Sequence, residues 1–182
     1  MEIRRVVTGH DERGRAVFVD DRRVEPITVA LAPGTEYHRL WEGDAPPSFP
    51  DDGAQGSPVA FFPPVGGYRF LIFSVPPGDR HSFRAPADMD AALAEIDEQL
   101  PGAREHMEPD APGMHTTASI DFEVVLDGEV WLELDDGAEV HLRAGDTVVQ
   151  NGTRHAWRNH GSAPARVVAF LVGAHHQHVP PA

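Results

Sequence analysis

The chain has 182 residues, enough for one domain with a sizeable core, and its 29 acidic and 15 basic residues give a formal net charge of -14, which disfavours a polyanionic partner such as nucleic acid. The absence of cysteine excludes disulfides, thiolate metal ligands and a cysteine nucleophile. No apolar run is long enough to span a membrane and the N-terminus has no apolar signal-peptide core, so we expect no membrane association and a cytoplasmic protein.

The first part of the chain, residues 1–64, is expected to contain short strands followed by a proline-rich loop. Strand-like runs at Arg4–Val7, Ala16–Val19 and Ile27–Ala30 are separated by polar turns that contain glycine. The stretch from Trp41 to Pro64 is rich in proline and includes an Asp-Asp-Gly turn. This composition predicts an irregular loop.

The next part combines one strong strand with one helix. The run Tyr68–Val75 is apolar, rich in β-formers and bounded by Gly-Gly and Pro-Pro-Gly. The segment Asp88–Leu100 places Met89, Leu93, Ile96 and Leu100 on one helical face. Pro-Gly follows it as a stop signal, so the pattern predicts a helix.

Six further strands follow in close succession, separated by Asp-Gly, Gly-Asp and Asn-Gly turns. Turns this frequent favour an antiparallel barrel. The predicted strands are Ser119–Leu126, Glu129–Leu134, Ala138–Leu142, Thr147–Gln150, His155–Asn159 and Ala165–Val172.

Two residue patterns in this strand-rich part resemble the two motifs of the cupin superfamily. The second motif, a Gly-Asp pair, a glycine, a histidine and an asparagine, is met by Gly145, Asp146, Gly152, His155 and Asn159. A partial first motif lies upstream, with His115 in its first position and Gly128 in its last. Thr117 stands where the family has a second histidine, and Asp121 stands where it has a glutamate.

The resemblance covers residues 65–174 and implies an all-β fold, the antiparallel double-stranded β-helix of a single cupin or jelly-roll barrel. Residues 1–64 would then extend the barrel sheet, and in cupins such strands often add to a partner subunit, which implies a homodimer. The helix at about 88–100 would be an insertion that either covers the barrel mouth as a lid or packs against the outer sheet. Residues 175–182 form a His-rich tail.

Strand alternation places a polar series on one face. His115, Thr117, Ser119, Asp121 and Glu123 share a parity, while Ile120, Phe122 and Val124 take the other face. A polar series that faces a barrel interior is costly unless it is solvated, hydrogen-bonded or bound to an ion. The pattern therefore indicates a functional site.

By position, the resemblance implies that His115, Asp121 and His155 hold a divalent metal. Two imidazoles and one carboxylate suit Fe(II), and the same set would hold Zn, Mn or Ni; no organic cofactor is expected. Glu123 and His155 are the candidate catalytic groups, and Thr117 and Trp157 are the candidate substrate contacts.

The leading hypothesis is a metal-dependent enzyme, an oxygenase, lyase, decarboxylase or isomerase, that acts on a small carbonyl, phenolic or carboxylic metabolite. Two alternatives stay open. A metal-free isomerase, epimerase or cyclase would use a His-Asp pair for proton abstraction. A non-catalytic cupin would bind a small molecule without changing it.

Four further features carry weaker interpretations. Phe122 is a candidate for an aromatic wall around a cyclic substrate, although strand aromatics are more often core. Arg69 and Arg158 are either substrate-carboxylate clamps or solvated arginines. The tail His175–His178 is expected to be disordered and is excluded from the site.

Overall fold

The computed structural model describes residues 2–56, 60–78 and 85–177. No helix within these ranges is long and apolar enough to cross a membrane. The elements in chain order are β1 (Ile3–His10), β2 (Ala16–Val24), β3 (Tyr37–Gly43), β4 (Tyr68–Val75), α1 (Met89–Gln99), the 3-10 turn η1 (Arg104–His106), β5 (Ser119–Asp127), β6 (Glu129–Glu133), the 3-10 turn η2 (Asp135–Gly137), β7 (Glu139–Arg143), β8 (Thr147–Gln150), β9 (Ala156–Arg158) and β10 (Ala165–Gly173).

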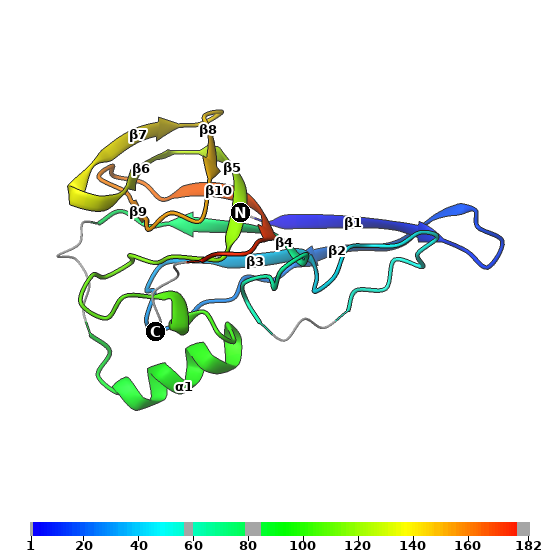
Figure 1. The fold of residues 1–182 in the computed structure, drawn as a ribbon, viewed down its shortest axis with the longest axis horizontal. Helices are drawn as coiled ribbons and strands as arrows, with labels where there is room; N and C mark the ends of the chain where they lie inside the picture. The colour runs from blue at the N-terminus through cyan, green and yellow to red at the C-terminus, as the bar shows by residue number, and fades with distance from the viewer. Residues whose placement is uncertain (1, 57–59, 79–84, 178–182) are drawn as a thin grey trace.

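Two antiparallel sheets face each other and form the barrel (Figure 1). One sheet has the strand order β3-β4-β10-β5-β8, and the other has the order β7-β6-β9. Apolar side chains from both sheets meet in a shared core, as expected for sheets that bury one face each. This core contains Val75, Val125, Val130, Leu132, Leu142, Ala165 and Val167. The predicted antiparallel barrel is confirmed.

Helix α1 covers the inner face of the large sheet beyond this core. Asp88 caps the helix, because its carboxylate accepts a hydrogen bond from the Ala91 N–H at 2.9 Å. Ile96 and Leu100 pack in one cluster with Leu71 and Leu171, whose side chains have the same strand parity as the core residues. Of the two predicted placements, the helix therefore takes the one at the open end of the barrel.

The N-terminal hairpin of β1 and β2 projects away from the barrel (Figure 1). Its base is held to the outer face of the large sheet by Ile3 and Val24, which pack with Leu40 and Ile72. Both strands are longer than predicted, and they pair only with each other among the strands that the structure describes.

Two predictions for the segment before β4 are wrong. Ile27–Ala30 is not a strand, since only Ile27 forms an isolated bridge, to Tyr37. The residues Tyr37–Gly43 instead form the edge strand β3, which overlaps the start of the predicted loop. Charged residues weaken the strand signal in the sequence. In the structure Arg39 and Glu42 form an ion pair within the sheet, with 2.6 Å between Arg39 Nη2 and Glu42 Oε2.

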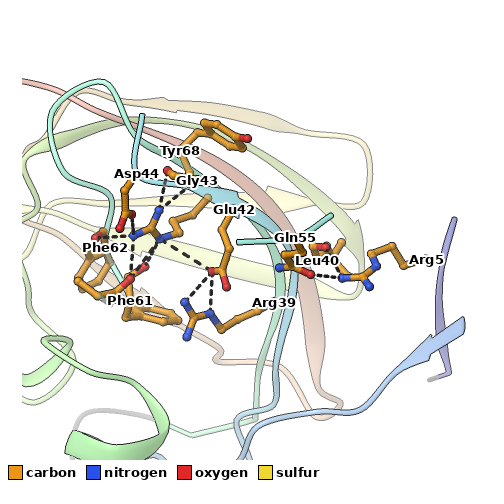
Figure 2. A network of polar contacts seen from close by, with 12 residues as sticks. Arg5, Arg39, Leu40, Glu42, Gly43, Asp44, Gln55, Phe61, Phe62 and Tyr68 are labelled. Carbon is orange, nitrogen blue, oxygen red and sulfur yellow. Dashed lines mark hydrogen bonds and ion pairs between the residues drawn. The ribbon is translucent and has the colours of Figure 1, made fainter. Parts of the chain in front are cut away.

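Arg69, on β4, donates hydrogen bonds to the irregular segment that follows β3, whose residues Asp44, Phe61 and Phe62 are labelled in Figure 2. Its guanidinium group is 2% exposed and directs all five N–H bonds at protein acceptors. The acceptors are the carboxylate of Asp44 and the carbonyl oxygens of Gly43, Ala60, Phe61, Phe62 and Tyr68. Arg69 is therefore neither a substrate clamp nor a solvated arginine, because it fixes the backbone of residues 60–62.

Substitution Arg69→Met is expected to lower the free energy of unfolding by about 3–5 kcal/mol, because the carbonyl groups and Asp44 lose their buried donors. For a chain of this size the loss corresponds to a decrease of roughly 10 °C in Tm, measured by differential scanning calorimetry. The matched control is Arg104→Met, which removes an exposed pair with Asp97 and should change Tm little. Equal decreases in the two variants would contradict a structural role specific to Arg69.

Candidate functional site

The inner face of β5 carries the polar series that alternation predicts. Thr117, Ser119, Asp121 and Glu123 are 1%, 4%, 4% and 5% exposed. Phe122, between the two acids, is 47% exposed on the outer face. The predicted shared face is confirmed, and Phe122 cannot form a wall of an interior site.

The two carboxyl groups of this series lack hydrogen-bond partners at one oxygen each. Across the sheet, Asp121 is paired in register with Leu171 and Gln150, and Glu123 with Ala169 and Val148. Within the described part of the chain, Asp121 Oδ1 and Glu123 Oε2 are buried without a hydrogen bond. Unpartnered buried polar atoms are costly and need an explanation.

Burial also changes the protonation of both acids. Loss of hydration raises the pKa of Asp121 to about 6, and a hydrogen bond from Ser119 opposes this increase. Loss of hydration raises the pKa of Glu123 to about 8, and the nearby Asp121 charge raises it further. At neutral pH the pair therefore consists of one ionised and one protonated carboxyl group.

His115 and His155 form a pair in the segments that precede β5 and β9. Their backbones exchange two hydrogen bonds of 3.0 Å, and the centroids of their rings lie 4.2 Å apart at an interplanar angle of 49°. Nδ1 of His115 donates to the Gly113 carbonyl at 3.0 Å, and Nδ1 of His155 donates to the Thr153 carbonyl at 2.9 Å. Each neutral ring therefore presents the lone pair of Nε2.

Both imidazoles favour the neutral form. Burial lowers the pKa of His155 to about 3, with the neighbouring His115 as a second cause. Burial is also the largest cause of the lowered pKa of His115. A neutral imidazole whose Nδ1–H is fixed by a carbonyl group has the form required of a metal ligand or a base.

The imidazole and carboxylate groups present are of the type that binds a divalent cation. Free Nε2 lone pairs and an unpartnered Asp121 oxygen fit that role chemically. The structure brings His115 and His155 together, but within the described residues no group of three His, Asp or Glu side chains is gathered for a metal ion. The three-residue ligand set stays a prediction.

The remaining predicted residues take supporting positions. The Thr117 hydroxyl accepts a hydrogen bond from Ser119 at 3.0 Å. Trp157 packs against Phe73 beside the barrel core, with ring centroids 5.9 Å apart. Asn159 donates to the carbonyl oxygens of Val75 and Ala163, so it holds the turn that follows β9.

Arg158 and the His-rich tail also have protein partners. Arg158 pairs with the buried Glu133 at 2.6 Å, so it is neither a clamp nor a solvated arginine. His176 donates from Nε2 to the Gly152 carbonyl at 3.0 Å, which places the tail as far as Gln177 beside the second motif. The expectation of disorder is wrong for this part, and its extension to His178 lies outside the described residues.

A cavity of about 250 Å³ lies next to this site and has no counterpart in the sequence-based predictions. Phe62, on its wall, contacts the rings of His106 and His115 at centroid distances of 4.8 and 6.4 Å. Its lining residues are Asp44, Ala60, Phe62, Pro63, Pro64, His106, Ala118 and Ser119. His106 belongs to neither motif, so no local signal in the sequence identifies it.

The family model for the cupin domain, Cupin_2, matches residues 103–171. This range contains both motifs, η1 and the strands β5 to β9 with most of β10. Helix α1 and the N-terminal hairpin lie outside the match.

Several fungal proteins are similar to this chain. Phomopsin biosynthesis cluster protein C' of Diaporthe leptostromiformis is 59% identical over 46 residues, which are 25% of this chain and 24% of that protein. Oryzines biosynthesis cluster protein J of Aspergillus oryzae is 35% identical over 91 residues, covering 43% of this chain and 51% of the relative. The chain thus spans a quarter to a half of the length of these two relatives. The cupin-domain-containing oxidoreductase fogC of Aspergillus ruber is 28% identical over 92% of this chain and 71% of its own length.

Solved structures give more distant similarities. A putative ethanolamine utilization protein Q from Salmonella typhimurium has a TM-score of 0.46 at 10% identity, covering 96% of this chain and 99% of that protein. A Cupin 2 conserved barrel domain protein from Salinispora arenicola has a TM-score of 0.42 at 16% identity, covering 85% and 92%. The two motifs and the two facing antiparallel sheets agree with the family model: residues 103–171 of this chain match a cupin domain, and the fold around them is a cupin-type barrel.

Proposed function

We propose that this protein is a metal-dependent cupin oxidoreductase that acts on a small organic metabolite. Relatives named as cupin-domain-containing oxidoreductases and as biosynthesis cluster proteins support the class of reaction and the setting. The observation that carries the proposal is the pair of buried acids, Asp121 and Glu123, each with one unpartnered oxygen, on the inner face that leads to two neutral imidazoles. A structural core would not retain such groups without a ligand.

In this proposal His115 and His155, with Asp121, hold the ion through Nε2 and carboxylate oxygens. A bound divalent ion would supply Lewis-acid or oxygen-activating chemistry. The carbonyl groups of Gly113 and Thr153 fix both rings in the tautomer that this role needs. Burial keeps both rings unprotonated, so no proton has to be displaced from them.

Glu123 is the proton carrier of the proposed reaction. Its carboxyl group holds a proton at neutral pH, with a pKa of about 8. It can donate that proton to an oxygen of the substrate and then act as a base, since its pKa lies close to the operating pH. Its register partners on the neighbouring strands, Ala169 and Val148, are apolar.

A second candidate, a metal-free isomerase or cyclase, is favoured by the same two acids. Their pKa values of about 6 and about 8 place a base and an acid side by side on one strand. Groups whose environments separate their pKa values are a common basis for assigning acid and base. In this case Asp121 would remove a proton and Glu123 would supply one, with no ion involved.

We further propose that the protein is a homodimer. An apolar row crosses the outer face of the large sheet, in register from Phe70 to Phe170 to Phe122 to Val149, and these residues are 39–56% exposed. The protein's own hairpin covers only the neighbouring residues Ile72 and Val168.

Charge and apolar surface favour a second copy as the cover of this row. Residues 3–24 contain six arginines and four acids, although the whole chain has a net charge of -14, so a hairpin is attracted to the body of another copy. The hairpin also exposes Phe18 at 81% and Val6 at 46%. A basic, partly apolar arm and an apolar row on an acidic body are mutually complementary.

For the metal, we expect the purified chain to bind Fe(II), Mn(II), Ni(II) or Zn(II) and to gain about 2.7 kcal/mol of stability at a free concentration of 100 times Kd. His155→Ala should abolish this gain, because one of the two imidazole ligands is lost. Thermal shift with each ion, combined with metal analysis by mass spectrometry, measures the effect. The control is His141→Ala, which removes an exposed histidine paired with Glu129. Equal gains in both variants, or no gain with any ion in the wild type, would refute the metal site.

For the acids, the contribution of Glu123 to the stability of the metal-free protein should be lost as pH rises from about 4 to 8, while the lowered pKa of His155 acts in the opposite direction below about pH 6.5, so variant and wild type are compared at each pH. The folded-state pKa of Glu123, about 8, exceeds the unfolded value of about 4.3, so its contribution is complete below pH 4.3 and is lost toward pH 8. Glu123→Gln should remove this loss and stabilise the metal-free protein at pH 8 by an amount on the order of 3 kcal/mol. Urea unfolding at pH 5 and pH 8 after chelation measures it. Glu98→Gln, on the exposed side of α1, is the control, and an equal gain there would contradict the assignment.

For the dimer, light scattering coupled to size exclusion should give twice the mass of the chain. Phe122→Ser and Phe170→Ser together should shift the mass toward the monomer, because the row loses its two central rings. Val140→Ser removes an exposed apolar side chain from β7, on the other sheet, and should leave the dimer intact. A monomeric wild type at micromolar concentration would rule out the proposed interface.

A further inference from the structure

The cavity beside His106 offers hydrogen-bond acceptors to a ligand. His106 donates from Nδ1 to the Thr116 carbonyl at 3.0 Å, so Nε2 of the neutral ring carries a lone pair. The one proton of the Ser119 hydroxyl goes to Thr117, at 3.0 Å, or to Asp121, so toward a ligand the Ser119 oxygen acts as an acceptor. Asp44 contributes a carboxylate. All three polar side chains on the wall therefore accept hydrogen bonds.

Among the residues that the structure describes, no side-chain donor on the wall is free to bind an anion. The described lining residues include no arginine, and the sequence contains no lysine. Arg69 lies behind the wall, but its five N–H bonds are occupied by Asp44 and by carbonyl groups (Figure 2). Its charge is balanced by Asp44 at 2.7 Å. A carboxylate ligand would face acceptors without a compensating cation.

The rest of the wall is apolar and suits a flat ring. Phe62, Pro63 and Pro64 come from the segment that Arg69 fixes, and Ala60 and Ala118 are small. The volume of about 250 Å³ is below the range of about 300–1,000 Å³ that is typical of drug-sized ligands. The cavity therefore fits one substituted ring.

The cavity also adjoins the proposed chemistry. Ser119, on its wall, precedes Asp121 by two residues on the same inner face of β5. Phe62 lies against both His106 and His115. A ring held here would share the Phe62 side chain with His115 and the Ser119 side chain with the inner face of β5.

We propose that this cavity binds the substrate ring and selects a neutral hydroxylated aromatic compound, a phenol, over the corresponding carboxylate or ether. The proposal rests on the proposed function for its link to chemistry, and it deepens that function by naming the substrate class. His106 Nε2 accepts from the phenolic O–H. Sites built to hydrogen-bond a hydroxyl group discriminate strongly against analogues that lack it.

The test uses three matched probes with the full chain: 4-ethylphenol, 4-ethylanisole and 4-ethylbenzoate. Binding is measured by ligand-observed NMR titration, before and after treatment with a chelator. We expect the phenol to bind at least about tenfold more tightly than the ether or the carboxylate. His106→Phe should weaken phenol binding about tenfold while it keeps the ring that packs on Phe62. Ala118→Phe, which fills the cavity, should abolish binding of the phenol.

The control is His160→Phe, in the loop after β9 and beside Trp131, which should leave all three affinities unchanged. Equal affinity for phenol and benzoate, or an unchanged phenol affinity in His106→Phe, would overturn the proposal. Loss of phenol binding after chelation alone would also overturn it, because an ion rather than the wall would then hold the hydroxyl group. All of these measurements report binding affinities at equilibrium. Their outcome can therefore be distinguished from a failure of the protein to bind metal or to turn over a substrate.

Discussion

The alternation of side chains along β5 is the constraint on which the rest of the structure depends. An extended chain cannot place Val125 in the core without also turning Glu123, Asp121 and Ser119 inward. The barrel interior is consequently polar around Ser119, Asp121 and Glu123 and apolar around Val125. Helix α1 and residues 60–64 cover this polar part with Ile96, Leu100 and Phe61. The inserted elements are therefore a consequence of what the strand carries inward.

Arg69 allows the segment that covers the polar part to be buried, because it binds the carbonyl groups of that segment. The segment after β3 has little regular structure, so its carbonyl groups have no ladder to pair with. One guanidinium group supplies several of them with donors and draws Asp44 to the same place. The result is a fixed wall with no excess positive charge. A lysine could not replace this arrangement, since it has three donors and no planar fork.

The sequence predicts the barrel well because its signals are local. Turn residues such as Asp127-Gly128 and strand periodicity define β5 to β10, and the Asp88 cap and the Ile96 spacing define α1. The pairing of His115 with His155 also follows from the two motifs. Sequence signals fail where the role of a residue depends on partners that are distant in the sequence. Arg69 looks like a surface arginine until its carbonyl acceptors are known, β3 is concealed by Arg39 and Glu42, and His106 joins a cavity whose other walls come from distant segments.

The departures from the family motif have a joint physical meaning. Replacing a histidine by Thr117 removes one imidazole from the interior, and its hydroxyl group binds Ser119 instead of projecting a lone pair on a ring. Replacing a glutamate by Asp121 shortens the acid, but Glu123 adds a second carboxyl group two residues further inward. Compared with the family motif, the interior has one imidazole fewer to bind a metal ion and one carboxyl group more to carry a proton. In the proposed function, an ion held by fewer protein ligands would leave more positions open, and a neighbouring acid with a pKa of about 8 could protonate what binds there. The proposal thus assigns the altered motif to chemistry on a substrate oxygen.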